Sequence, residues 1–188
     1  LALFPGKKNY LDIYMQNDLV GPQSLLGHAI HLDSFERAQL AETRAVAVHC
    51  PTSNLFLGSG LFDFEDFKKK GIRTAVATDT GGGTSHNMLQ TLADAYKIQQ
   101  LRSYSLNPFE SIYWGTLGNA RALNLSDEIG CFKPGNFADF VVLNSSATEL
   151  SKIRMKTCES LAEELFVLQT LGDDRFIRSV YIAGMKQK

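Results

Sequence analysis

The chain has 188 residues, of which 44% are hydrophobic and 21% are charged, and its formal net charge is −1. This composition is ordinary for a globular protein, and a nearly neutral chain has no basic field that would attract nucleic acid or a membrane surface. No apolar run approaches the ~18 residues that a membrane-spanning helix needs. The three cysteines lack zinc-finger spacing, which favours free thiols in a reducing, cytoplasmic compartment.

Strand and helix patterns alternate up to Leu123. Short apolar runs rich in β-branched or small residues predict buried strands at 24–30, 45–49 and 72–78. Capping signals and apolar stripes predict helices at 33–42, 63–70, 87–101 and 107–123. The residues between Cys50–Pro51 and the second of these helices are expected to form a loop. This alternation predicts parallel strands joined by right-handed crossovers, in a barrel or a doubly wound sheet.

The pattern changes after Leu123. A turn signal at Pro134–Gly135 opens a different order of elements. Strand, helix and strand are expected in turn at 138–143, 160–171 and 177–183. We therefore divide the chain into a larger unit, residues 1–123, and a smaller one, residues 124–188. The opening LALFPGKKNY resembles the end of a helix and a turn rather than a natural start, so we expect a fragment of a longer protein.

The stretch TAVATDTGGG, residues 74–83, carries the most informative chemistry. Asp79 stands where the third expected strand ends, and a carboxylate there needs a metal ion, an acid–base role or a helix N-terminus to stabilise it. His28 and His49 stand near the ends of the first two strands, so all three groups are expected at one edge of the sheet. The alternative for each histidine is a buried, hydrogen-bonded imidazole. Gly81–Gly83 could hold a phosphate, although it matches neither common nucleotide motif.

Several segments together resemble a known family. LLGHAIHL, VAVHCPTSNLFLGSG, TAVATDTGGG and NMLQTLADAY, in this order, resemble the amidohydrolase superfamily of metal-dependent TIM barrels, and most of all its guanine deaminases. IGCFKPGNFADFVVLN and the late LGDDR, residues 171–175, add to this resemblance. The resemblance implies an α/β fold that contains strands six to eight of a (β/α)8 barrel, followed by a segment that returns to a small β-sandwich domain.

The resemblance also implies roles for two residues. Asp79 matches the acid that ligates zinc and takes a proton from the bound water, and His28 matches the histidine that hydrogen-bonds this water; both border the substrate. Asn54 is expected near the pocket, whereas no role is implied for His31 or His86. The family's HxH pair, its further histidine ligand and its proton-shuttling glutamate have no counterpart here. We therefore expect the 188 residues alone to be inactive. One aspartate does not decide between zinc and iron.

The expected function is the hydrolytic deamination of guanine to xanthine and ammonia by a complete, homodimeric enzyme. Its expected partner is this small molecule, with no role for nucleic acid or membrane. Two alternatives remain open. The first is another aminohydrolase or chlorohydrolase that acts on a different heterocycle. The second is a non-catalytic α/β module that binds a nucleotide through the turn at Thr80–Thr84.

Overall fold

The structure of the protein is a computed structural model that describes residues 3–187. Leu1 and Ala2, part of the expected helix end, lie outside the described residues. The strands are β1 Leu25–Gly27, β2 Val46–His49, β3 Arg73–Val76, β4 Phe140–Leu143, β5 Ile177–Ile182 and β6 Met185–Lys186. The helices are α1 Tyr10–Met15, α2 Ser34–Thr43, α3 Pro51–Phe56, α4 Phe64–Lys69, α5 Met88–Leu101, α6 Pro108–Tyr113, α7 Asn119–Ala122, α8 Glu149–Met155 and α9 Leu161–Leu171.

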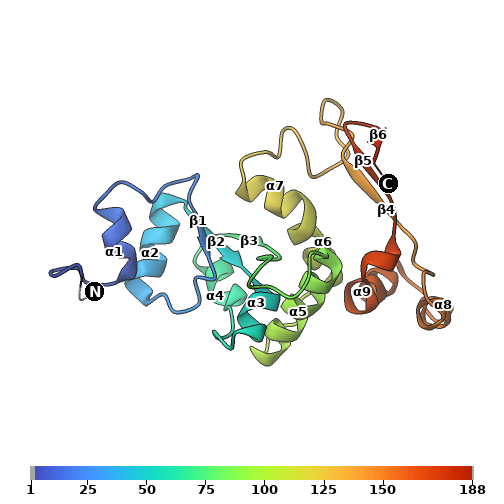
Figure 1. Cartoon of the computed structure of the whole chain (residues 1–188), viewed down its shortest axis with the longest axis horizontal. Coiled ribbons are helices and arrows are strands. Elements are labelled where there is room, and N and C mark those ends of the chain that lie inside the picture. Colours follow the sequence, from blue (N-terminus) through green and yellow to red (C-terminus); the bar gives the residue numbers. More distant parts are fainter. Residues whose placement is uncertain (1–2, 188) are drawn as a thin grey trace.

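The described strands form two separate three-stranded sheets. The first has the order β1-β2-β3 and is parallel, as the alternating pattern predicted, with Leu25 opposite Val46 and Val46 opposite Arg73. Figure 1 shows α1 and α2 at one end of the molecule, the first sheet near the middle, and the second sheet with the C-terminus at the other end. The chain therefore has a mixed α/β fold with the parallel sheet in its N-terminal part.

The first and third strands are shorter than the sequence predicted. β1 ends at Gly27 because His28 and Ala29 adopt left-handed backbone angles, with φ of 68° and 50°. β3 ends at Val76, and Asp79 follows with φ of 51°. Left-handed backbone is disfavoured for residues with a Cβ, and such strain persists only where the surroundings enforce it. Both positions singled out by the sequence are thus places where the chain leaves a strand abruptly.

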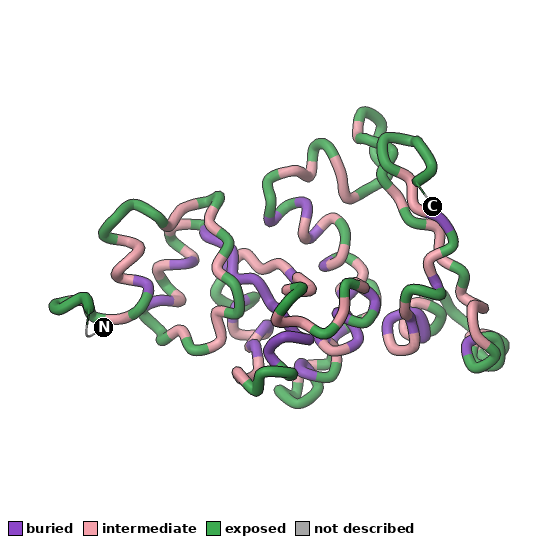
Figure 2. The backbone as a smooth tube through the Cα atoms, viewed as in Figure 1, coloured by how far each residue is buried: buried purple, intermediate pink, exposed green. Residues whose placement is uncertain are grey.

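Side chains of β2 alternate between two environments, because successive residues of a strand point to opposite faces. Val46 and Val48 pack on one face with Cys50, with the alanines of β3 and the residue after it, and with Ala122 of α7. Ala47 and His49 point to the other face, against the surrounding helices. That helix layer holds the main core, and full burial of a side chain such as Phe67 contributes roughly 1.5–3 kcal/mol. Buried residues concentrate in the first sheet and the helices beside it (Figure 2).

Most predicted helices are confirmed, and their caps explain where they begin. Asp33 accepts a hydrogen bond from the Glu36 amide and completes the predicted capping box of α2. Asn87, Asn107 and Ser160 cap the starts of α5, α6 and α9 in a similar way. The loop expected after Cys50 is wrong, because its first part forms α3. α1 and α8 were not predicted either.

The helix predicted over 107–123 is divided in the structure. A π-helical turn, Trp114–Gly118, separates α6 from α7, and Thr116 within it has non-helical backbone angles. α7 then places Asn119 beside β3, where its side chain accepts from the Val76 amide and donates to the Val76 carbonyl, both at 2.9 Å. This paired contact ties α7 to the strand that precedes Asp79.

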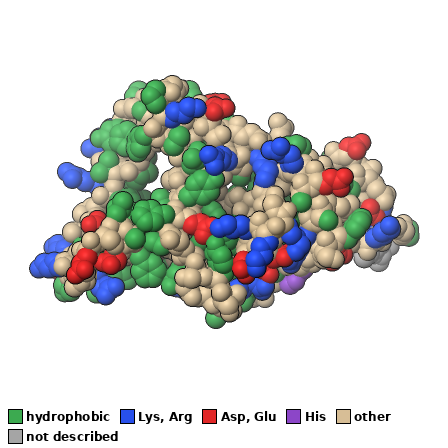
Figure 3. All heavy atoms as spheres, turned by 180° about the vertical axis from the view of Figure 1, so that it is seen from behind, with side chains coloured by type: hydrophobic (Ala, Val, Ile, Leu, Met, Phe, Trp, Pro, Cys, Tyr) green, Lys and Arg blue, Asp and Glu red, His purple; other side chains and the backbone are tan. Residues whose placement is uncertain are grey.

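The second sheet has the order β4-β5-β6 and is antiparallel. β4 and β5 follow the predicted strands closely, whereas β6 lies beyond them and was not predicted. α9 connects this part to the first by packing against α5 and α6. Large hydrophobic side chains are exposed here, including Phe132, Val141 and Met185, and the view from behind shows such side chains on the surface (Figure 3). Among the described residues, none of the helices has the length and apolar character required to span a membrane.

Candidate active site at the carboxyl ends of the parallel strands

Three potential metal ligands converge where the parallel strands end. A ligand atom from each of His28, Cys50 and Asp79 lies within 4.8 Å of the other two. His28 Nε2 and Asp79 Oδ2 are 3.9 Å apart, which is longer than a hydrogen bond and leaves both atoms facing a common space. The two side chains are 47% and 35% exposed, so a small molecule can reach them. The structure thus brings together His28 and Asp79, from strands that are not neighbours.

The glycine turn after Asp79 packs closely on its surroundings. The Gly83 amide donates to the Asp79 carbonyl at 2.5 Å. A Cβ on Gly83 would lie 2.0 Å from the Thr78 carbonyl oxygen, and one on Gly82 would lie 3.0 Å from Asp79 Oδ2. These glycines therefore allow a close backbone approach that fixes the Asp79 side chain. The close packing gives no support to the phosphate-binding interpretation of the turn.

The first turn of α3 contacts both sides of the site. Thr52 Oγ1 donates to the Thr78 carbonyl at 3.1 Å, next to Asp79. Asn54 Nδ2 lies 2.9 Å from His28 Nδ1, so the residue expected near the pocket touches the candidate histidine directly. Ser53 is fully buried, close to the position of Gly82. Pro51 stands at the first position of α3, where proline is favoured, so the sequence holds a signal for this helix that the predicted loop does not use.

His49 does not join the site, which corrects the expectation of three ionisable groups at one edge. Its ring stacks on Phe62 with centroids 4.6 Å apart and is 1% exposed. Burial lowers the pKa of His49 to about 3, so the imidazole is neutral. Cys50, the next residue, occupies the mouth instead, and burial raises the pKa of its thiol. The alternative of a buried histidine is right for His49, although its ring nitrogens have no hydrogen-bond partner among the described residues.

The other two histidines take no part in the cluster. His31 lies 2.7 Å from the Ser59 carbonyl through Nε2 and closes a loop. His86 is exposed, next to the N-cap of α5. Neither side chain is among the grouped ligand atoms of the described residues.

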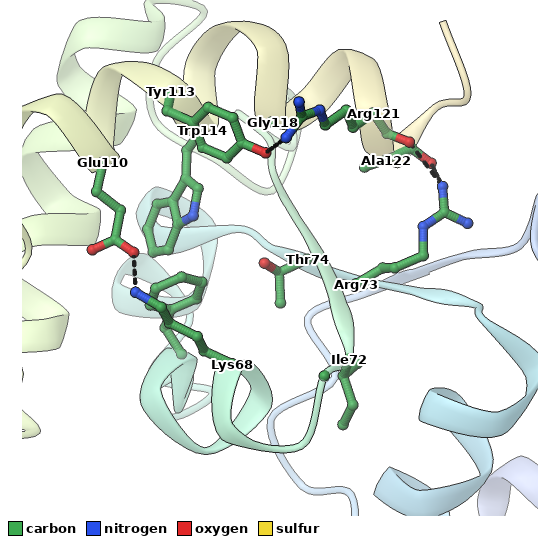
Figure 4. Close-up of a pocket in the computed structure, with 12 residues that line it drawn as sticks. Lys68, Ile72, Arg73, Thr74, Glu110, Tyr113, Trp114, Gly118, Arg121 and Ala122 are labelled. Carbon is green, nitrogen blue, oxygen red and sulfur yellow. Dashed lines mark hydrogen bonds and ion pairs between the residues drawn. The ribbon is translucent and has the colours of Figure 1, made fainter. Parts of the chain in front are cut away.

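A pocket of about 390 Å³ lies at the other end of β3, away from Asp79. Figure 4 shows Lys68 paired with Glu110 on one side of it, Trp114 above, and Arg73 on the opposite side. The Arg73 guanidinium donates to four backbone carbonyl oxygens, those of Pro22, Arg44, Arg121 and Ala122, and to Asn124 Oδ1. This pocket is bordered by structural contacts and lacks the His28–Asp79 pair. Trp114 is 5% exposed and belongs to the core.

The LGDDR segment lies closer to the site. Leu171, Gly172 and Asp173 line a second pocket together with Thr52 of α3 and Thr84 of the glycine turn. A Cβ on Gly172 would lie 2.2 Å from the Leu168 carbonyl oxygen, so this position needs glycine for the chain to leave α9 against α5. The segment therefore borders the same pocket as the turn that follows Asp79.

The donor set fits a divalent transition metal. Carboxylate oxygen, imidazole nitrogen and thiolate sulfur are all ligands of zinc, and imidazole with carboxylate also suits iron. Their atoms lie within 4.8 Å of one another at an accessible strand end. The described residues supply at most three such ligands, of which Asp79 is the one that the sequence predicted.

A parallel α/β segment with a histidine and an aspartate at the carboxyl ends of its strands has the arrangement in which barrel enzymes place their catalytic groups. The particular family is shown by a family model, described as the amidohydrolase family, which matches residues 2–185. The chain belongs to this family. The resemblance stated from the sequence motifs is thereby confirmed.

Individual relatives narrow the comparison. Guanine deaminase from Escherichia coli K12 is 46% identical over 183 residues, which cover 97% of this chain and 42% of that protein. A solved structure of E. coli guanine deaminase matches with a TM-score of 0.98 at 45% identity, over all of this chain and 44% of the other. A guanine deaminase from C. acetobutylicum, solved with bound guanine in the active site, matches with a TM-score of 0.84 at 26% identity, over 98% and 44% of the two chains.

More distant structures share the fold alone. An adenosine deaminase from Xanthomonas campestris, solved with bound zinc, matches with a TM-score of 0.77 at 23% identity. The match covers 94% of this chain and 39% of the other. The chain spans less than half the length of each of these proteins. It therefore corresponds to a segment of the amidohydrolase fold, which confirms the expected α/β class.

Proposed function

We propose that the protein to which this chain contributes hydrolyses guanine to xanthine and ammonia. The observation that carries this proposal is the approach of His28 Nε2 to within 3.9 Å of Asp79 Oδ2 at the carboxyl ends of the strands. The 46% identity to the E. coli guanine deaminase and the guanine bound in the C. acetobutylicum structure favour this substrate. Because the chain spans 42% of that relative, the activity is assigned to the whole protein and not to these residues alone.

We infer that Asp79 holds a zinc ion, with iron as the alternative. When bound, such an ion would supply the nucleophile by lowering the pKa of a water to about 7. Asp79 takes a proton from the attacking water, for which its carboxylate must lie ~2.6–3.2 Å from that water in the reactive complex. His28 faces the same space and donates a hydrogen bond to the oxygen that gains negative charge. Removal of one such donor typically lowers kcat by roughly 100- to 1,000-fold.

The balance of the reaction follows from these roles. The water oxygen bonds to the ring carbon that carries the amino group, and the bond from that carbon to nitrogen breaks. The proton held by Asp79 passes to the departing nitrogen, which leaves as ammonia, and the second proton of the water passes to the adjacent ring nitrogen. The carbon retains the oxygen, so guanine and water give xanthine and ammonia, with no oxidant or further reactant.

We also infer the place of each part in the complete enzyme. β1, β2 and β3 would be strands six to eight of the barrel, with residues 1–123 as its partial barrel unit. Residues 124–188 would lead to the small β-sandwich, which the antiparallel order of β4, β5 and β6 favours. The complete enzyme would be a cytoplasmic homodimer, and the free thiols of Cys50, Cys131 and Cys158 suit a reducing compartment.

The test uses the full-length protein and measures ammonia release from guanine, adenine and a chlorinated triazine, together with metal content. We expect guanine turnover that a chelator removes and added zinc restores. Asp79→Ala should lower both bound metal and turnover, the latter by at least about 100-fold. Asp127→Ala is the matched control, because the Asp127 side chain is 95% exposed and pairs with Lys133, which is not one of the residues of the site.

Three outcomes would contradict the proposal. Inert guanine with turnover of another heterocycle would indicate a sister aminohydrolase or chlorohydrolase. Nucleotide affinity without metal dependence would indicate a binding module. Full metal content and a near-normal rate in the Asp79→Ala protein would refute the role of Asp79.

A further inference from the structure

We propose that Asn54 is a positioning residue that holds His28 in the tautomer with its proton on Nε2, directed toward Asp79. This inference deepens the proposed function and rests on it for its catalytic consequence. The structural part concerns a single hydrogen bond between α3 and the end of β1, which can be measured without any assay of activity.

The contact itself defines which atom donates. Asn54 Nδ2 lies 2.9 Å from His28 Nδ1. An amide nitrogen carries two hydrogens and only donates, so Nδ1 must accept with its lone pair. A neutral imidazole with a bare Nδ1 carries its hydrogen on Nε2. That is the atom 3.9 Å from Asp79 Oδ2, so the Asn54 bond sets the chemical character of the atom that faces the site.

Asn54 is buried, so its side-chain amide needs a hydrogen-bond partner, and His28 is that partner. Asn54 is 1% exposed, and burial of an amide is unfavourable unless it makes hydrogen bonds. Its Oδ1 has no partner among the described residues. Within this part of the chain, the Asn54 side chain therefore makes its hydrogen bond to His28. Among the described residues, the Asn54 side-chain amide thus contacts the candidate histidine and makes no hydrogen bond to a third element.

Both ends of the contact are held by backbone hydrogen bonds. The Asn54 amide donates to the Cys50 carbonyl and its own carbonyl accepts from Ser59, each at 2.9 Å. The His28 amide donates to the Val48 carbonyl at 2.9 Å while φ is 68°, so the residue is fixed in a strained conformation. These bonds fix the two backbones, and the Asn54 amide therefore meets the His28 ring at Nδ1. A donor in this place favours the tautomer in which Nδ1 carries no hydrogen.

The tautomer decides what His28 can do. With hydrogen on Nε2, the ring donates to an oxygen placed between it and Asp79. With hydrogen on Nδ1, a bare Nε2 would face the carboxylate and the reacting oxygen with a lone pair, and the stabilising donor would be lost. Loss of an outer partner that orients a site residue commonly lowers activity about 10- to 100-fold.

The experiment uses the full-length protein labelled with ¹⁵N in histidine, and reads the protonation of each His28 nitrogen by NMR above the ordinary histidine pKa. The His28 signals are identified by their loss in His28→Gln. In the unaltered protein we expect a bare Nδ1 and a protonated Nε2. Asn54→Asp keeps the shape but replaces the donor by an acceptor, so Nδ1 should become protonated. Asn54→Leu removes the bond and should give a mixture of tautomers.

The control and the kinetics separate positioning from folding. Asn107→Asp makes the same chemical change at the exposed N-cap of α6, where a carboxylate caps equally well, so tautomer and rate should not change. Asn54→Asp should lower kcat about 10- to 100-fold with a smaller change in KM. A His28 protonated at Nδ1 in the unaltered protein, or a folded Asn54→Asp protein with unchanged tautomer and rate, overturns the inference. If guanine is inert but the tautomers change as expected, the proposed function fails and the positioning role stands.

Discussion

The buried imidazole of His49 makes the stability of the protein sensitive to acid. Its ring lies between Phe62 and Trp114, with centroids 4.6 and 6.4 Å away. Burial lowers the pKa from 6.5 to about 3, whereas the unfolded chain exposes the ring and protonates it near the ordinary value. Between these two pKa values the unfolded state therefore binds one proton more than the folded state. As a result, the free energy of unfolding falls as the pH falls through this window.

The magnitude follows from the two pKa values. Near pH 7.5 both states are almost fully deprotonated at this residue, so its contribution to the pH dependence is close to zero. Near pH 5 the unfolded imidazole is almost fully protonated while the folded one is neutral. Integration of the linkage relation gives a loss of about 2 kcal/mol between these conditions from His49 alone.

The assay is urea unfolding of the full-length protein and of His49→Phe at both pH values. A phenylalanine does not titrate, and it replaces two ring nitrogens that have no partner among the described residues. The unaltered protein should lose about 2 kcal/mol more than the variant on acidification. An equal loss of unfolding free energy in the two proteins would show that His49 has the same pKa in the folded and the unfolded state. That result would refute the burial argument.

Two further predictions concern the frame of the site. Gly83→Ala should lower turnover and bound metal, because its Cβ would lie 2.0 Å from a backbone oxygen of the Asp79 turn. Gly27→Ala is the control and should change neither, because no atom lies within 4 Å of its Cβ. Equal kinetics of the two variants would contradict this prediction. Arg73→Lys should lower the free energy of unfolding by about 1.5–3 kcal/mol, since an ammonium cannot reach four carbonyls and Asn124 at once. An unchanged urea midpoint would show that these bonds do not hold the ends of the strands together.

The sequence predicted the parallel core well because its signals are local. Apolar runs mark the three strands, and capping residues such as Asp33 and Asn107 mark the helix starts. The strand ends were less predictable, since the left-handed angles of His28 and Asp79 depend on contacts with α3 and the glycine turn. A local sequence pattern does not predict those contacts, because they join residues more than twenty positions apart.

The two errors near the site have simple causes. His49 was placed at the mouth because it ends a strand, but alternation along β2 turns its side chain into the helix layer and leaves the next position, Cys50, facing the site. The sequence predicts a loop where α3 forms, although Pro51 stands at the first position of this helix, the same signal that correctly predicts α6 after Asn107. Short helices built from Thr, Ser and Asn have low propensity, and here burial of the first turn overrides it.

The contact between Asn119 and Val76 has a consequence for strand addition. The Ala77 amide bonds to His49 in β2, so the Val76 peptide groups point to the opposite side of β3, and the Asn119 amide engages both of them. A carboxamide in that place imitates one residue of a neighbouring strand. Any strand that pairs along this border must therefore displace Asn119 or stop short of Val76, which restricts both the register of a native neighbour and association with foreign strands.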